Sequence, residues 1–414
     1  MPRKRKKSKK GKAKLPIWTK VYRKRKKKDY RYVLNTEILR LIGILYQKRK
    51  PVPMIKAAED KLLAIEVLRI LGVPERFLED VVLMNLDVLK IIKPPYKMGV
   101  AKNPAELVEA SKPTPLVRLK IKDMPTIWAK LEWFNPFSLS VKDRIAAGIL
   151  LALLEIMDEV KGVTEVSSGN TGIAIASLVR ALGLDARIYF PGYTPEATRA
   201  TLDLLGVEYK ISDKGLTVDL IDDVKLWAKW TGFTHVDQFE NDYNFLTHLR
   251  TTTIEIIEQL EKAKAKPDKI VLVSGTSGTS AAVSFGLYHY YKGRPDIYIV
   301  QPAKDEVIEG IRRLETGAKW LEMIREAGLE YNIIDVKRQD ALCAVREIAR
   351  NTGLLPGPSS GAAYAGIKQL VEHGEIERKH TVITLFPDHG LRYIDRLIQA
   401  KCSDNSSEAN GSQA

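Results

Sequence analysis

Cysteine is scarce in this chain, because its 414 residues contain only Cys343 and Cys402. Two cysteines exclude a framework of several disulfides and any cysteine-rich zinc site, and we expect no metal. Scarce cysteine is typical of proteins from a reducing compartment, so we expect a cytoplasmic protein. Long apolar runs are also lacking. The longest, IAAGILLALLEIM at 145–157, is too short to cross a bilayer. The basic N-terminus has no apolar segment behind it, so we expect neither a membrane span nor a secretory signal.

Acidic residues are missing from residues 1–28, which hold 16 Lys and Arg. The rest of the chain keeps 50 of the 66 basic residues against all 51 acidic ones, so its net charge is close to zero. Self-repulsion predicts a disordered basic tail over 1–33. Trp18 and Tyr22 interleave with the charges, so this tail could bind RNA or DNA by phosphate contacts and stacking. A solubilising tail is the alternative.

Two kinds of pattern follow the tail. Residues 34–100 show apolar positions at helical spacing and predict a helical N-terminal extension. From residue 101 strands alternate with helices, which predicts an α/β fold with mostly parallel sheets. The clearest predicted strands are 186–191, 207–212, 269–275, 296–302, 330–336 and 381–387. The polar stretch 401–414 is a predicted disordered tail.

Lys142 opens a predicted helix behind the loop of KLEWFNPFSLSVKDR, residues 130–144. A lysine at a strand-to-helix junction is held still and partly screened from water. Burial can lower the pKa of its amine, which suits Schiff-base chemistry. The alternative is a solvated lysine on an amphipathic helix.

Three further loops of small polar residues each follow a predicted strand or enter a helix. They are SSGNTG at 167–172, SGTSGTS at 274–280 and GPSSGAA at 357–363. A loop of this kind presents backbone N–H groups at the positive end of a helix dipole, where a carboxylate or phosphate binds. Each loop alone would also pass as a capped helix start.

Read in order, the four loops resemble the pyridoxal-phosphate-dependent (PLP-dependent) cysteine synthase family, of fold type II. VDQFENDYN at 236–244 and FPDHGLRY at 386–393 are similar to two more segments of that family. The resemblance covers roughly residues 110–400. It implies two α/β domains with the cofactor between them, and usually a homodimer. We expect a large cofactor-binding domain at 101–125 and 246–400, and a small mobile domain at 126–245.

The resemblance also implies roles for matching positions. Lys142 would hold the cofactor as an aldimine and carry the α-proton, and Asn170 would bond the ring hydroxyl. A serine of the pair Ser359 and Ser360 would meet the pyridine nitrogen. The cofactor phosphate would lie on Gly275, Thr276, Ser277, Gly278 and Thr279. The substrate carboxylate would lie on Ser167, Ser168, Asn170, Thr171 and Gln238. Ser277 stands where the family usually has glycine, and its hydroxyl could add a phosphate contact.

The implied reaction is a β-replacement that converts an activated serine and sulfide to L-cysteine through an α-aminoacrylate. The adjacent residues Arg312 and Arg313 suggest that the leaving group is phosphate, because guanidinium groups bind phosphate bidentately. The long N-terminal extension is similar to that of archaeal O-phosphoserine sulfhydrylases. The expected donor is therefore O-phosphoserine, with O-acetylserine as a second possibility. Cystathionine β-synthase activity on serine and homocysteine is the near alternative, and a nucleic-acid-binding protein is the alternative of another class.

Overall fold

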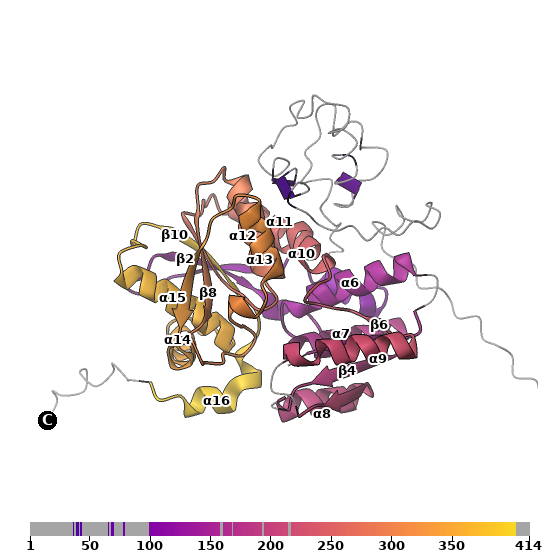
Figure 1. Cartoon of the computed structure of the whole chain (residues 1–414). Helices are drawn as coiled ribbons and strands as arrows, with labels where there is room; N and C mark the ends of the chain where they lie inside the picture. Colours follow the sequence, from indigo (N-terminus) through magenta and orange to yellow (C-terminus); the bar gives the residue numbers. More distant parts are fainter. Residues whose placement is uncertain are drawn as a thin grey trace, which may run out of the picture.

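The computed structural model describes residues 99–157, 160–167, 169–192, 194–213 and 217–402. It also describes scattered positions between 36 and 78 (Figure 1). The predicted tail 1–33, most of the predicted helical extension, and all of the predicted tail 401–414 except residues 401 and 402 lie outside the described residues. Four of the scattered positions, Leu39, Ile42, Leu68 and Leu78, are buried in the same core cluster as Phe285.

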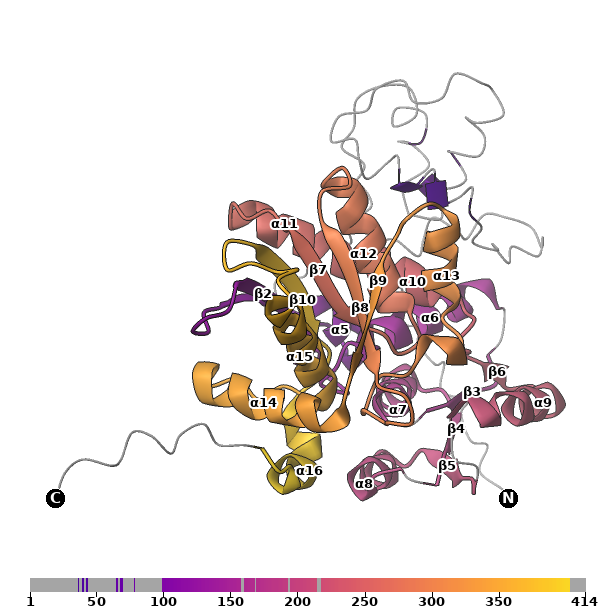
Figure 2. The same cartoon turned by 60° about the vertical axis from the view of Figure 1, so that its left-hand side comes forward.

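Two β-sheets organise the chain, as Figures 1 and 2 show. A six-stranded sheet has the order β1-β2-β10-β7-β8-β9, and a four-stranded sheet has the order β5-β4-β3-β6. The strands are β1 (Leu116–Leu119), β2 (Thr126–Leu131), β3 (Val163–Val166), β4 (Ala186–Phe190), β5 (Glu208–Ile211), β6 (Thr234–His235), β7 (Lys269–Val273), β8 (Asp296–Pro302), β9 (Asn332–Val336) and β10 (Thr381–Phe386).

The helices fill the segments between the strands. They are α5 (Leu107–Ala110), α6 (Lys142–Ile156), α7 (Asn170–Leu182), α8 (Glu196–Leu205), α9 (Ile221–Thr231), α10 (Tyr243–His248), α11 (Ile254–Lys262), α12 (Gly278–Tyr290), α13 (Lys319–Glu326), α14 (Arg338–Thr352), α15 (Pro358–Glu372) and α16 (Ile394–Gln399).

The six-stranded sheet is covered on both faces, and its inner strands are mostly apolar, as expected for strands buried on both sides. Only the edge pair β1–β2 is antiparallel, and the other pairs are parallel. Side chains of β7 alternate between two cores. Ile270 and Leu272 join one core with α11, α12 and α13, and Val271 joins the other with α14 and α15. Figure 2 shows these helices on opposite sides of the strands.

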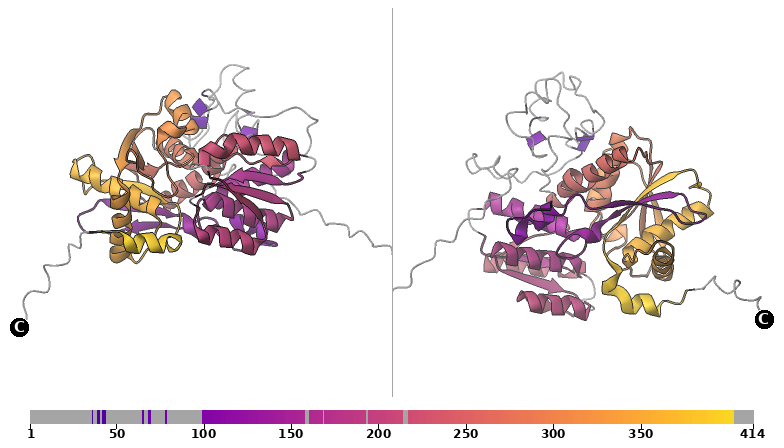
Figure 3. Two further views of the ribbon diagram at one scale, coloured as in Figure 1. Left: turned by 60° about the horizontal axis from the view of Figure 1, so that its bottom comes forward. Right: turned by 180° about the vertical axis from the view of Figure 1, so that it is seen from behind.

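The four-stranded sheet forms the second, smaller layered body (Figure 3). All of its strand pairs are parallel. Helices α6, α7 and α8 pack on one core, which includes Val163 and Ile188, while α9 covers Val166 and Tyr189. Parallel strands end at the same edge of a sheet, so the loops after β3 and β6 emerge together.

The predicted α/β fold with mostly parallel sheets is confirmed. One predicted boundary differs from the topology. Strand β2, at the start of the predicted small domain 126–245, pairs with β10 and belongs to the six-stranded sheet. Within the described part of the chain, we find no helix with the length and apolarity needed to span a bilayer.

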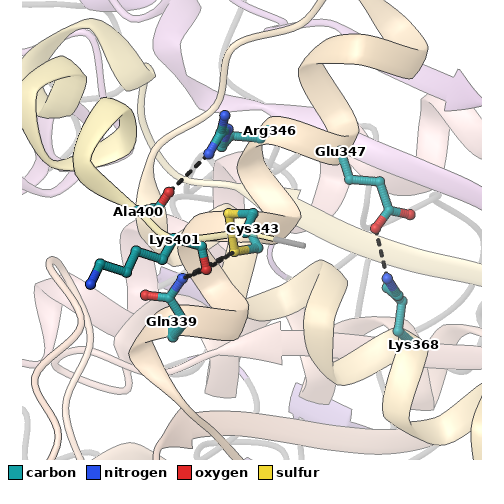
Figure 4. The surroundings of a disulfide bond; sticks show 8 residues. Gln339, Cys343, Arg346, Glu347, Lys368, Ala400 and Lys401 are labelled. Carbon is teal, nitrogen blue, oxygen red and sulfur yellow. Dashed lines mark hydrogen bonds and ion pairs between the residues drawn. A yellow bond between two sulfur atoms is a disulfide. The ribbon is translucent and has the colours of Figure 1, made fainter. Parts of the chain in front are cut away.

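The two cysteines form one disulfide, which the sequence did not indicate. Cys343 in α14 bonds to Cys402, 59 residues further on, with a Cα–Cα distance of 5.5 Å (Figure 4). Beside the bond, Arg346 donates to the carbonyl of Ala400. Disulfides are typical of oxidising compartments and of intracellular proteins from hyperthermophiles. The bond therefore gives no support to the reducing setting expected from scarce cysteine.

Replacing Cys343 and Cys402 together by serine should destabilise the fold. A closed loop of this length is worth roughly 2–4 kcal/mol of unfolding free energy, because the crosslink restricts the unfolded chain. Denaturant unfolding of the variant and of the wild type with and without reductant checks this. Equal unfolding midpoints for oxidised wild type and variant would contradict it.

Candidate active site

Lys142 is fixed at the carboxyl end of the six-stranded sheet. β2 leads into a 3₁₀ turn, Glu132–Phe134, and the loop then returns to β10 before α6 begins at Lys142. The Val141 N–H donates to the Pro387 carbonyl at 2.8 Å, and Ser140 forms a β-bridge with Asp388. The residue before Lys142 and the residue after β10 are thus bonded to each other, which defines where the lysine side chain starts.

The two residues after Lys142 hold the loop in place. The Asp143 carboxylate accepts the Phe137 N–H at 2.7 Å and the Ser138 N–H at 2.9 Å. Arg144 is 1% exposed and lies between two buried carboxylates, with Nε 2.6 Å from Glu132 and Nη1 2.7 Å from Glu255. Burial opposes ionisation of Glu132, but Arg144 outweighs it and holds the pKa of this carboxyl well below its usual range.

The amine of Lys142 has the electrostatics that Schiff-base chemistry needs. Burial lowers its pKa to about 8, with Asp388 raising the pKa and Arg312 lowering it. At neutral pH a useful fraction of the amine is therefore uncharged, in contrast to an ordinary lysine.

Asp388 joins the two α/β bodies beside Lys142. Its Oδ2 accepts the Asn170 Nδ2–H at 2.8 Å and the Tyr393 hydroxyl at 2.6 Å. Asn170 is the first residue of α7 in the smaller body, so this contact crosses from one sheet to the other. Burial raises the pKa of Asp388, although its two hydrogen bonds oppose the rise.

The turn after β7 lies next to Lys142. One pocket is lined by Lys142 together with Gly275, Thr276, Ser277 and Thr279. Ser277 has a left-handed backbone with φ of 74°, which explains why glycine suits this position. Its hydroxyl accepts the Trp320 N–H at 3.2 Å, so this oxygen is used within the protein.

Two buried side chains of α10 form hydrogen-bond contacts with the same turn. Asn244 Nδ2 donates to Thr276 Oγ1 at 2.9 Å, and His248 Nε2 lies 2.9 Å from Thr279 Oγ1. Burial holds the pKa of His248 well below its usual range. Close packing explains the glycine between them, since a Cβ on Gly278 would lie 2.1 Å from Asn244 Oδ1.

The predicted pyridine-nitrogen serines open α15. Ser359 and Ser360 are both buried. Ser359 Oγ faces Gly310, which lines the pocket of Lys142, at 3.8 Å from the position of a Cβ on that glycine. Ser360 Oγ is buried without a hydrogen-bond partner. The arrangement leaves both serines as candidates, and Ser359 is the one that lies beside Gly310.

Three of the predicted carboxylate-binding residues come together, and Ser168 lies outside the described residues. Ser167 Oγ accepts the N–H of Gly169 at 3.1 Å and of Gly172 at 2.8 Å. Thr171 Oγ1 donates to Gln238 Oε1 at 2.7 Å. These segments follow β3 and β6, which are neighbours in the smaller sheet.

The two predicted arginines have different surroundings. Arg312 Nε donates to the Gly275 carbonyl at 2.9 Å, so its side chain lies against the 275–279 turn. Arg313 instead bonds Glu315 at 2.8 Å and Asp335 at 3.2 Å. Of these two arginines, only Arg312 contacts the turn that lines the pocket of Lys142.

Sequence reasoning missed three residues of the site. Asp388 lay within a recognised segment, FPDHGLRY, but received no role. Asn244 likewise ends a recognised segment, VDQFENDYN, without a role, and His248 had no local signal. The importance of both arises from contacts with residues more than thirty positions away. Among the described residues, no cluster of His, Cys, Asp and Glu could hold a metal ion.

Comparison with known proteins defines the class of this site. A family model described as "Pyridoxal-phosphate dependent enzyme" matches residues 108–388. The chain is 34% identical to the cysteine synthase of Aquifex aeolicus, over 68% of this chain and 88% of that protein. It is 31% identical to cysteine synthase B of Escherichia coli, over 68% of this chain and 91% of that protein.

A solved cysteine synthase from Entamoeba histolytica superposes with a TM-score of 0.62 at 30% identity, covering 74% of this chain and 93% of that one. The chain belongs to the cysteine synthase family of PLP-dependent enzymes.

The residues present fit the cofactor. Asn170 Oδ1 and Ser360 Oγ are buried polar atoms without hydrogen-bond partners, as expected where a polar ring is to be bound. The turn that begins at Gly275 lines the pocket of Lys142 and leads into the N-terminus of α12, a position that suits a phosphate. Gly275 itself is required by packing, since a Cβ there would meet the Gly310 carbonyl at 2.8 Å. Lys142, the turn and the serines would hold the group, which supplies an electron sink for chemistry at the α-carbon.

Lys142 should be the attachment point of the cofactor. We expect borohydride reduction of the PLP-loaded protein to leave the reduced cofactor mass on the peptide that contains Lys142, located by mass spectrometry. Lys142→Ala should carry no such label and should lose the visible absorption. A label on another lysine in the wild type would refute the assignment.

Replacing Asp388 by asparagine should lower the pKa of Lys142 below about 8, because the nearby negative charge that raises it is removed. The measurement is the pH dependence of the rate at which PLP attaches to the cofactor-free protein, since only the uncharged amine reacts. Its midpoint should move to lower pH in Asp388→Asn. The matched control is Asp395→Asn, an exposed position on α16. A midpoint shifted equally in both variants would contradict the prediction.

Proposed function

We propose that this protein is a cysteine synthase whose preferred donor is O-phosphoserine. The observation that carries the proposal is Arg312, a cation fixed beside the 275–279 turn with one amino group unused. Nε bonds Gly275, Nη2 donates to the Gly317 carbonyl at 2.6 Å, and Nη1 is buried without a hydrogen-bond partner.

Groups of both signs surround Arg312. A cavity of about 630 Å³ is lined by Arg312, Lys319 and Phe239, and also by Glu240, Glu322 and Glu326. The case for a phosphate ligand therefore depends on the guanidinium itself. The guanidinium lies 4.6 Å from the Phe239 ring centroid. Burial lowers the pKa of Arg312 to about 10, partly opposed by Glu240, so the group stays charged at neutral pH. A half-desolvated guanidinium with a free N–H edge binds phosphate better than it binds a neutral ester.

The chain's own residues divide the work of the reaction. The amide and hydroxyl groups of Ser167, Thr171 and Gln238 would bind the donor carboxylate. Lys142 Nζ, with its pKa near 8, would accept the α-proton of the donor and later return it. Arg312 would stabilise the phosphate as the Cβ–O bond breaks. Sulfide then forms the new Cβ–S bond, giving cysteine and inorganic phosphate.

The oligomeric state, the location and a nucleic-acid partner of this protein stay predictions. A homodimer and a cytoplasmic location are expected from resemblance and composition. Nucleic-acid binding through residues 1–28 concerns a segment outside the described residues. O-Acetylserine is the alternative donor, and the condensation of serine with homocysteine is the alternative reaction. Both are tested by comparing turnover of the different substrates.

Arg312→Ala should lose the preference for O-phosphoserine. The ratio of kcat/KM for O-phosphoserine to that for O-acetylserine, both with sulfide, should fall roughly 10- to 100-fold, the effect of a hydrogen bond to a charged group. Arg313→Ala is the matched control, because its guanidinium is engaged by Glu315 and Asp335. An unchanged ratio in Arg312→Ala would contradict the proposal. Turnover of serine with homocysteine above both donors would favour cystathionine synthesis instead.

A further inference from the structure

A buried carboxylate lies beneath the segments that would bind the donor carboxylate. Glu165, in β3, has a side chain that is 0% exposed. Its Oε1 accepts the Val166 N–H at 2.7 Å, and its Oε2 accepts the Gln238 N–H at 3.0 Å. One carboxylate therefore fastens the chain just before Ser167 to the backbone of Gln238.

The orientation of Gln238 depends on this attachment. Its Nε2 donates to the Val166 carbonyl at 2.8 Å, and its Oε1 accepts from Thr171 at 2.7 Å. With the backbone held by Glu165, the side chain bridges β3 and the start of α7. If the hydrogen bonds of Glu165 were lost, the two segments that would bind the carboxylate could move relative to each other.

A histidine that can carry a positive charge lies beside Glu165. His235, in the neighbouring strand β6, has Nε2 3.5 Å from Glu165 Oε1. Its Nδ1 lies 3.7 Å from Asp237 Oδ2, and Asp237 pairs with Lys225 of α9 at 3.1 Å. Within the described part of the chain, His235 is the one cationic side chain in ion-pair contact with Glu165. An isolated buried carboxylate is costly, so this contact matters.

The protonation of His235 follows from its neighbours. Burial lowers its pKa, but Glu165 and then Asp237 outweigh the burial, so the pKa lies above its ordinary value, while Lys225 opposes them. The ring therefore keeps its proton to a higher pH than an ordinary histidine does, and loses it as the pH rises further.

We propose that His235 is a positioning residue for the donor carboxylate. Its positive charge holds Glu165, which in turn holds the Ser167–Thr171 segment against Gln238, and donor binding weakens when the ring loses its proton. This inference rests on the proposed function in taking those segments as the carboxylate site. An uncompensated Glu165 would also add negative charge beneath a site for a carboxylate.

The sign of the pH effect distinguishes this role from simple packing. The charged ring is present at low pH, so replacing it should matter most there. We expect His235→Gln to raise KM for O-phosphoserine about fivefold at pH 6, the effect of roughly one net hydrogen bond. The ratio of variant to wild-type KM should fall toward one at pH 9. kcat should change little, because Lys142 is untouched.

The experiment uses the PLP-loaded enzyme with saturating sulfide, and measures KM and kcat from pH 6 to 9. His373→Gln, an exposed histidine at the far end of α15, is the matched control. A KM ratio that does not change with pH, or that equals one at pH 6, would overturn the inference.

A second measurement is independent of turnover. The His235 ring is titrated by NMR in the loaded wild type and in Lys225→Met, whose removal of a positive charge should raise the His235 pKa. Glu165→Gln should lower it, since burial then acts unopposed by that carboxylate. No shift in either variant would overturn the inference. Absence of turnover with shifts as expected would count against the proposed function alone.

Discussion

The hydrogen-bonded carboxylate of Asp388 is the contact on which the arrangement of the site depends. β10 lies between β2 and β7 in the six-stranded sheet, so its carboxyl end is central. Directly after it, Asp388 accepts bonds from Asn170 of the smaller body and from Tyr393 near the C-terminus. Its backbone is bridged to Ser140, two residues before Lys142. One residue therefore sets the lysine, the asparagine and the C-terminal segment relative to one another.

The buried ion pairs around Arg144 are better explained by position than by stability. A buried ion pair often stabilises a fold no more than apolar residues of the same volume would, because both charges lose their hydration. Arg144, however, bonds Glu132 of the loop and Glu255 of α11 at once, and Lys130 of β2 also bonds Glu255. Because these contacts are directional, they fix both the position and the orientation of the first turn of α6. Apolar packing specifies an orientation less well. The cluster thus keeps Lys142 pointing into its pocket.

Local pattern predicted most of the strands and the four loops, because both depend on residues close together in the chain, but it missed β1 and β6. Contacts between distant residues were beyond its reach. The Asn170–Asp388 bond spans 218 positions, and the Cys343–Cys402 disulfide spans 59. Arg312 and Arg313 are the same residue type, so the sequence alone could not show which of them lies beside the 275–279 turn. The backbone conformation determines this. The Arg312 N–H donates to the Ser274 carbonyl at 3.0 Å, which turns that side chain toward the pocket.

The arginine proposed to bind the donor and the turn proposed to bind the cofactor phosphate share one piece of backbone. Arg312 is bonded to the carbonyls of Ser274 and Gly275, at the start of the turn that would hold the cofactor phosphate. The carbonyl of Gly310 packs where a Cβ of Gly275 would be. The 310–312 segment can therefore move only if the turn moves with it. If Arg312 selects the donor as proposed, a change of leaving group would act through the side chain at 312, since a larger shift of this backbone would disturb the 275–279 turn.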